Sequence, residues 1–395
     1  MLSFMTPAVV FLRQLLRHVL GMKGIGFSIA RILRFLPAET AHHLGLRCLA
    51  SPMVVALMDP PLLPRRDLSC KLLPGLSPLM HPVGLAAGYD KDATSIRGLF
   101  KLGFSFVEVG TVTVRAQYGH KKPRLFRLHD SMELINRMGF PNKGAQVMQN
   151  TLSHFHQWLH PHGSLDSSTS VTKDPDPIVG INVGKNKDTP LEAAIDDYIL
   201  AMEMLLAYGS YFTINISSPN TAGLRSLATS SFFKVLSQRS SALESHLPSK
   251  IWIKLSCDDP QEVFQKHIED ILAAGFAGLI LTNTHAVNQP FKGGLSGHSL
   301  RSLAMQRLLW AKEVHQGHLS VIAVGGIITG RDILHAICLG ASAVQIYTAL
   351  VYRGPQVVAK MLKELDDELN YLGLKNLEEA RQLVTSPYHH HEGFS

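Results

Sequence analysis

Residues 251–284 read IWIKLSCDDPQEVFQKHIEDILAAGFAGLILTNT and contain one complete unit of the fold. Short apolar runs stand at 251–256 and 278–284, and the stretch 261–274 between them has a helical pattern. A strand, a helix and a second strand in this order favour parallel pairing of the two strands, with the helix as the crossover. This stretch therefore predicts an α/β fold with a parallel sheet.

The same unit is repeated in both directions along the chain. Helical patterns occupy residues 190–208, 331–339 and 355–372, each beside an apolar run. Eight strand–helix units favour a closed (β/α)8 TIM barrel over an open doubly wound sheet. The eight expected strands span 83–87, 106–112, 178–183, 211–217, 251–256, 278–284, 321–325 and 343–348.

Composition and charge are those of a globular protein with a full core. Of the 395 residues, 46% are hydrophobic and 17% are charged, and the net charge is +7. The sequence has no basic stripe with interleaved aromatic residues, so nucleic acid is not an expected partner. The cysteines at 48, 70, 257 and 338 form no CxxC pair. Neither a disulfide framework nor a metal site is therefore expected.

The N-terminal segment has a different character. Five basic residues and no acidic ones precede Glu39, and Arg13 and Arg17 interrupt the first apolar run. A transmembrane span is therefore not expected. The pattern at 7–20 instead fits an amphipathic helix that lies flat on an anionic membrane surface. Further apolar segments span 29–36, 40–49 and 53–57. The alternative is that these helices only pack on the main domain.

The sequence also indicates where the domains begin and end. Residues 59–64 contain three prolines, which cannot continue a helix, and are interpreted as a linker. The segment at 164–177 is rich in Ser, Thr, Asp and Pro and is expected to be a surface loop. The expected division is a helical membrane-associating segment (1–64), a barrel (65–374) and a C-terminal tail (375–395).

Polar residues or glycines stand at the end of every expected strand. In a barrel of this kind the carboxyl ends of the strands meet on one face, and that face holds the active site. Lys254 lies inside an otherwise apolar run and would be costly to bury without a partner. We therefore expect a site built from strand-end residues: Ala87, Gly88, Lys91, Thr111, Asn182, Asn215, Lys254, Thr282, Asn283, Thr284, Gly325, Gly326, Tyr347 and Thr348.

The glycines and asparagines indicate the kind of ligand. The pair at 325–326 follows the seventh strand, where barrels commonly bind phosphate, and Ser296-Gly297 has the same character. No GxGxxG or GxxxxGK[ST] motif is present, which disfavours a Rossmann dinucleotide site and a P-loop. Five asparagines suit a planar ligand such as a pyrimidine or a flavin ring, because each amide donates and accepts: Asn136, Asn182, Asn215, Asn220 and Asn283.

The serine-rich stretch at 215–221 raises one alternative. A triad hydrolase would need a base close to Ser218, and the sequence places no histidine beside it and contains no GxSxG motif. A hydrolase is therefore not supported.

Taken together, these motifs resemble the dihydroorotate dehydrogenase family from about residue 83 to residue 355. The N-terminal segments resemble those of its class 2, quinone-dependent, membrane-associated members. The matching motifs are AAGYDK at 86–91, INRMGF at 135–140, NVGKN at 182–186, NISSPNT at 215–221, TNT at 282–284, GGLSG at 293–297 and VGG at 324–326. Two features depart from the family: the 164–177 segment is longer, and the stretch from His285 to Gly293 differs.

The resemblance implies a reaction. Dihydroorotate would be oxidised to orotate in de novo pyrimidine biosynthesis, with a tightly bound FMN as hydride acceptor and a quinone as the final electron acceptor. Ser218 would remove the C5 proton, with Thr221 as a candidate relay, while hydride passes from C6 to flavin N5. Class 1 members have cysteine at this position, so Ser218 favours a quinone over fumarate or NAD as oxidant.

The resemblance also implies a role for each matching residue. The substrate would be held by Lys91, Asn136, Met138, Gly139, Phe140, Asn215, Asn220, Asn283 and Thr284. FMN would be held by Ala87, Gly88, Thr111, Asn182, Asn215, Lys254, Thr282, Ser296, Gly297, Gly325, Gly326, Tyr347 and Thr348. The quinone would contact His42, Arg127 and Tyr347 in an apolar tunnel formed by the N-terminal helices.

The expected protein is a monomeric, peripheral membrane enzyme. It would lie on the cytoplasmic (inner) membrane of a bacterium or on the mitochondrial inner membrane of a eukaryote. Two alternatives stay open from the sequence. One is another FMN-dependent barrel oxidoreductase, such as a class 1-like member or a dihydrouridine synthase. The other is a non-catalytic ligand-binding barrel at the membrane.

Overall fold

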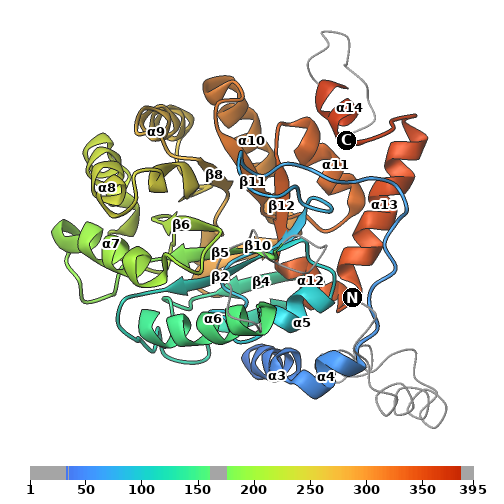
Figure 1. Ribbon diagram of the computed structural model, residues 1–395, viewed down its shortest axis with the longest axis horizontal. Coiled ribbons are helices and arrows are strands. Elements are labelled where there is room, and N and C mark those ends of the chain that lie inside the picture. Colours follow the sequence, from blue (N-terminus) through green and yellow to red (C-terminus); the bar gives the residue numbers. More distant parts are fainter. Residues whose placement is uncertain (1–32, 34, 161–175, 384–395) are drawn as a thin grey trace.

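Eight parallel strands close into a barrel in a computed structural model, which describes residues 33, 35–160 and 176–383 (Figure 1). Around the barrel the strands follow the order β1-β12-β11-β8-β7-β6-β5-β2. The strands are β1 (Val83–Leu85), β2 (Phe106–Val112), β5 (Ile178–Val183), β6 (Tyr211–Asn215), β7 (Ile251–Leu255), β8 (Gly278–Leu281), β11 (Ser320–Val324) and β12 (Ala343–Ile346). The (β/α)8 TIM barrel and all eight predicted strands are confirmed.

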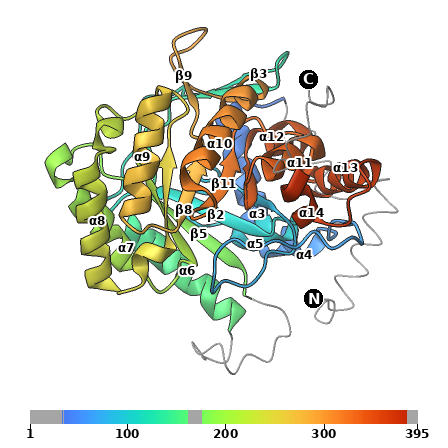
Figure 2. The same ribbon diagram turned by 90° about the horizontal axis from the view of Figure 1, so that it is seen from above.

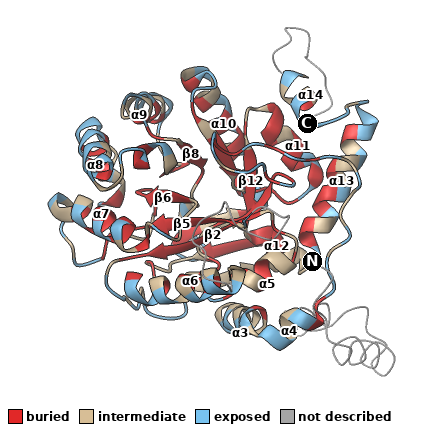
Figure 3. Ribbon diagram, viewed as in Figure 1, coloured by how far each residue is buried: buried red, intermediate tan, exposed pale blue. Residues whose placement is uncertain are grey.

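Helices form an outer ring, and their inward faces are buried (Figure 3). The ring consists of α5 (Ile96–Lys101), α6 (Ala145–Leu159), α7 (Ala194–Leu205), α8 (Ser230–Leu243), α9 (Gln261–Ala273), α10 (Arg301–His315), α11 (Gly330–Cys338) and α13 (Val357–Tyr371). Shorter helical turns are η2 (Leu191–Ala193), η3 (Leu224–Leu227), η4 (Leu247–Lys250), η5 (His298–Leu300) and α12 (Thr348–Arg353). In α13 the buried residues Met361, Leu365 and Leu369 repeat at helical spacing, which directs one face toward the barrel.

A second sheet was not predicted from the sequence. It is antiparallel, in the order β3-β4-β10-β9, and comes from two hairpins inserted after β2 and β8. Its strands are β3 (Leu125–Leu128), β4 (Glu133–Asn136), β9 (His285–Val287) and β10 (Gly293–Gly297). Strands β3 and β9 are the two edges of this sheet, and both lie at the same end of the molecule (Figure 2). The sheet carries Arg127, Asn136 and Ser296, and so supplies part of the site described below.

Two N-terminal helices lie against the barrel, α3 (Ala38–Ala50) and α4 (Pro52–Leu57). They correspond to the apolar segments predicted at 40–49 and 53–57, and both contact α5. The amphipathic helix predicted at 7–20, most of 29–36 and most of the loop predicted at 164–177 lie outside the described residues. Within the described part of the chain, no helix is long and apolar enough to span a membrane.

The packed part of the chain continues past residue 374, where the sequence placed the end of the barrel. Helix α14 (Leu377–Gln382) contacts α11 and buries Leu377 and Ala380. These two apolar residues are the reason that this turn packs on the domain. Residues 384–395 of the expected tail lie outside the described residues.

Candidate active site

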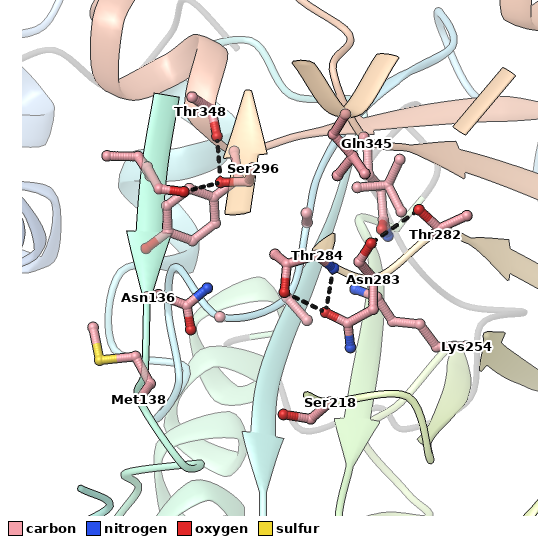
Figure 4. A pocket seen from close by; sticks show the side chains of 18 of the residues that line it. Asn136, Met138, Ser218, Lys254, Thr282, Asn283, Thr284, Ser296, Gln345 and Thr348 are labelled. Atoms are coloured by element: carbon pink, nitrogen blue, oxygen red, sulfur yellow. Dashed lines mark hydrogen bonds between the residues drawn. The ribbon is translucent and has the colours of Figure 1, made fainter. Parts of the chain in front are cut away.

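A cavity opens at the carboxyl ends of the barrel strands and encloses about 1110 Å³, its open mouth included (Figure 4). It is lined by nearly all of the residues predicted for the substrate and the cofactor. These are Ala87, Gly88, Lys91, Thr111, Asn136, Met138, Gly139, Phe140, Asn215, Ser218, Asn220, Lys254, Thr282, Asn283, Thr284, Ser296, Gly297, Gly325, Gly326, Tyr347 and Thr348. The barrel topology and the second sheet thus bring together residues that are up to 261 positions apart in sequence (Ala87 to Thr348).

Asn182 is the exception, because it lies one layer below the cavity. It is fully buried, and its Oδ1 accepts hydrogen bonds from Thr111 Oγ1 at 2.6 Å and from Asn215 Nδ2 at 3.2 Å. Its Nδ2 donates to Glu108 Oε1 at 2.8 Å. Asn182 therefore orients the two side chains that do line the cavity. Thr111 itself stands where the β2–β5 register shifts, as is common where a strand aims a side chain into a site.

The amide side chains form two hydrogen-bonded groups along the cavity wall. Asn283 Nδ2 donates to Asn215 Oδ1 at 3.3 Å and to Ser217 Oγ at 2.9 Å. Asn220 Nδ2 donates to the side-chain oxygen of Asn136 at 3.2 Å. Buried amides held in this way present donors and acceptors at fixed positions. The wall is therefore suited to a flat ligand with several polar edge groups.

Ser218 lies in the loop after β6 and is only 6% exposed. Its Oγ accepts a hydrogen bond from the backbone N–H of Asn220 at 3.3 Å. In the described residues no imidazole or carboxylate hydrogen-bonds to this hydroxyl, so no triad is formed there. Thr221, the candidate relay, does not line the cavity and makes no hydrogen bond with Ser218.

Two lysines bring positive charge to the cavity. Lys91 Nζ donates to the carbonyl of Gly88 at 2.5 Å, and burial, reinforced by repulsion from Arg124, lowers the pKa of Lys91 to about 8. Lys254 is 6% exposed, and its ammonium donates no hydrogen bond to any described residue. Burial lowers the pKa of Lys254, and the negative charge of Glu108 opposes this shift.

Gln345 also lines the cavity with Lys254 and was not among the site residues predicted from the sequence (Figure 4). Gln345 is fully buried and donates from Nε2 to Glu108 at 2.8 Å, but its Oε1 has no partner among the described residues. A buried polar atom without a partner is costly. The unpaired atoms of Lys254 and Gln345 therefore fit a bound molecule with both an acceptor and a donor on its edge, such as a flavin ring.

One side of the cavity is suited to the phosphate group of a flavin nucleotide. Gly326 has a φ of 69°, and a Cβ there would lie 2.4 Å from the backbone at the start of α10. Ser296 and Thr348 join their hydroxyl groups at 2.9 Å on the same side of the cavity (Figure 4). Glycines and hydroxyl groups gathered at one end of a cavity are features of a phosphate site.

A second cavity of about 980 Å³, its open mouth included, lies between α3 and the barrel. Its wall is mostly apolar, and it shares Leu125, Leu134 and Tyr347 with the first cavity. The three residues predicted for the quinone, His42, Arg127 and Tyr347, all line it. Burial holds the pKa of His42 well below its usual value, so this imidazole is neutral at pH 7.

Comparisons with known proteins agree with this geometry. The family model described as dihydroorotate dehydrogenase matches residues 73–369. "Dihydroorotate dehydrogenase (quinone)" of Myxococcus xanthus is 38% identical, covering 90% of this chain and 96% of that protein. The mitochondrial protein of that name from Mus musculus is 37% identical, covering 90% and 88%. A crystal structure of DHODH from Eimeria tenella in complex with ferulenol superposes with a TM-score of 0.78 at 31% identity, covering 93% of this chain and 100% of that one.

Proposed function

Because the chain belongs to the dihydroorotate dehydrogenase family, we propose that its two cavities divide one oxidoreduction between them. Dihydroorotate is oxidised to orotate in the first cavity, and a quinone is reduced in the second. The enzyme is a quinone-linked oxidoreductase of pyrimidine biosynthesis. The shared wall supports this division: a cavity lined by many polar side chains and a mostly apolar cavity meet at Leu125, Leu134 and Tyr347.

We assign FMN to the first cavity. Lys254 and Gln345 would meet the polar edge of its ring, Thr111 would lie against the ring, and Gly326 and Thr348 would hold its phosphate. When bound, FMN accepts hydride from the substrate and passes electrons to the quinone. The ammonium of Lys254 stabilises negative charge at the edge that it faces, and its burial strengthens that effect.

The substrate is a carboxylate anion with a cyclic amide ring, and the cavity supplies a partner for each part. Lys91 offers a positive charge to the carboxylate, and Asn136, Asn220 and Asn283 offer amides to the ring edge. Asn220 donates to Asn136, and Asn283 donates to Asn215 and Ser217, so these amides are oriented before the substrate arrives. Pre-oriented groups lower the cost of holding the substrate in its reactive geometry.

We assign proton removal to Ser218. A free serine hydroxyl is a weak base, and it gains strength when it is shielded from water and aligned by a neighbour. Ser218 is buried at the cavity wall, and the N–H of Asn220 fixes its Oγ. As Ser218 Oγ takes the C5 proton, its own hydroxyl proton passes to solvent water at the open mouth of the cavity, because Thr221 makes no hydrogen bond with Ser218.

The second cavity suits a lipid-soluble quinone. Its apolar wall would hold the ring and side chain, while His42, Arg127 and Tyr347 offer polar contacts to the carbonyl oxygens. Large apolar side chains are exposed around α3 and α4, among them Phe35 at 87% and Met53 at 66%. We propose that these helices rest on a membrane surface, from which the quinone enters. Relatives of this kind occur in bacteria and in mitochondria, so a peripheral position on either inner membrane fits.

One experiment tests the reaction directly. The purified holoenzyme is mixed anaerobically with dihydroorotate, and we expect its flavin absorption bands to bleach. A short-chain ubiquinone should restore the bands, whereas fumarate and NAD should not. Bands that do not bleach would refute the proposed reaction, and recovery with fumarate or NAD would refute the assignment of the quinone.

The role of Ser218 is tested by substitution. Ser218→Ala should retain its flavin but bleach at least about 100-fold more slowly, because general base catalysis contributes on this scale. Ser226→Ala, a change at an exposed position, is the matched control and should bleach normally. Loss of the flavin from Ser218→Ala would mean that this serine is structural.

A further inference from the structure

Tyr89 is a buried phenol that the proposed reaction does not yet use. It lies in the loop after β1, is 9% exposed, and lines the second cavity. Its ring meets His42 edge-on, with centroids 5.0 Å apart, and meets Tyr347 edge-on at 5.5 Å. The three rings form a continuous row from α3 to the wall shared with the first cavity.

The hydroxyl group of Tyr89 has no partner within the described residues, since no hydrogen bond to it is formed there. A buried tyrosine hydroxyl normally finds a partner, because an unsatisfied polar atom is costly. Its oxygen faces α3 at Gly45, where a Cβ would lie 3.7 Å away. Gly45 also lines the second cavity and adds no side chain, so the hydroxyl of Tyr89 borders the cavity beside α3.

The residues around the Tyr89 hydroxyl suit a ligand whose oxygen atom accepts a hydrogen bond from it. Burial raises the pKa of Tyr89, so the phenol keeps its proton and acts as a donor at neutral pH. The neighbouring His42 is neutral for the reason given above, and the surrounding residues Ala41, Leu49 and Met58 are apolar. A molecule that fills this space therefore needs an apolar body with an accepting oxygen at one end.

We propose that Tyr89 is a further quinone-binding residue, which donates a hydrogen bond to one carbonyl oxygen of the quinone head group beside His42. This inference rests on the proposed function of the second cavity. When the quinone takes up two electrons and two protons to become a quinol, negative charge develops on its oxygens. A donor already aimed at one of them stabilises that charge without reorganisation.

The test uses the holoenzyme and the variant Tyr89→Phe, which keeps the ring row and removes only the oxygen. We expect the KM for a short-chain ubiquinone to rise about fivefold to tenfold, the effect of one lost hydrogen bond. The same loss should appear in the dissociation constant, measured from the thermal shift that this quinone gives the oxidised holoenzyme. Flavin bleaching by dihydroorotate should be unchanged, because the first cavity is intact. Tyr208→Phe, remote from both cavities, is the matched control.

A second variant separates this inference from the function on which it rests. Gly45→Leu fills the space in front of Tyr89 with a residue that favours helix formation, and it should abolish quinone turnover while bleaching stays normal. If Gly45→Leu reduces quinone as the wild type does, the proposed quinone site is wrong. If Gly45→Leu blocks turnover but Tyr89→Phe changes neither constant by more than twofold, the cavity is right and the role of Tyr89 is refuted.

Discussion

The lowered pKa of Lys91 predicts how substrate binding depends on pH. Burial and the nearby charge of Arg124 reduce the pKa of this ammonium to about 8 in the free protein. The proposed role of Lys91 is to attract the carboxylate of dihydroorotate, which requires the charged form. A bound carboxylate keeps the ammonium protonated, so the pH dependence of binding reports the free enzyme.

The size of the effect follows from the charged fraction. With a pKa of about 8, about 90% of the lysines are charged at pH 7 and about 10% at pH 9. The affinity for dihydroorotate should therefore fall about tenfold over this range, which corresponds to about 1.4 kcal/mol. Below pH 7 the affinity should be constant, because the group is already charged.

Calorimetric titration of the Ser218→Ala holoenzyme with dihydroorotate, without quinone or oxygen, measures this affinity, because reduction of the flavin is slowed at least about 100-fold. Two further substitutions of Lys91 provide controls in that background. Lys91→Arg should bind without a fall between pH 7 and 9, since a guanidinium stays charged. Lys91→Gln should bind weakly at every pH. A constant affinity up to pH 9 with lysine in place, or the same fall with glutamine, would refute this reasoning.

Three further predictions concern the stability of the fold, the attachment of α3 and the retention of the flavin. The Nδ1 of buried His81 accepts from the N–H of Val83, and burial lowers the pKa of His81 to about 4. Because the unfolded chain binds this proton more readily, stability should fall by about 3 kcal/mol from pH 7 to pH 4, and urea unfolding of His81→Gln should lack that part of the fall. Glu39 on α3 pairs with Arg124 at 2.9 Å, both nearly buried. Glu39→Gln should speed proteolytic cleavage at α3 severalfold while the barrel stays resistant, since it leaves a buried charge uncompensated; an unchanged cleavage rate would contradict this. Gly326→Ala places a Cβ against the backbone of α10 at a positive φ, a strain that costs on the order of 1–3 kcal/mol. Less than about half of the purified variant should therefore contain flavin, as measured by its visible absorbance. Full flavin occupancy would contradict this prediction.

The barrel could be predicted because its strands are continuous apolar runs. Each run is buried on both faces, so its composition alone distinguishes it from its surroundings. The second sheet gave no such signal: β10 reads GGLSG, and β9 has three residues. Glycine-rich and very short strands lack the composition of strands. They form here because β10 pairs with β4 and β9 pairs with β10.

Site residues could be predicted where a polar or charged residue interrupts or ends an apolar strand. Lys254 stood out as a charge inside an apolar run, and Gln345 in AVQI offers the same signal, which the sequence analysis did not use. The place of Asn182 below the cavity depends on how Thr111 and Glu108 approach it, which no local pattern encodes. Tyr89 belongs to a recognised motif, but its contact with α3 is set by packing between segments 47 positions apart in sequence (His42 to Tyr89).

The shared wall at Tyr347 also has a consequence for the order in which the two reactants bind and leave. If dihydroorotate and the quinone occupy separate cavities, as proposed, neither has to leave before the other binds, and a molecule bound in one cavity does not compete for the other. The rate of a step in nucleotide synthesis then responds to how much oxidised quinone the membrane holds. When respiration stops, the membrane quinone accumulates as quinol and less oxidised quinone is left to accept electrons. Pyrimidine synthesis would then slow without a regulatory site or a conformational change.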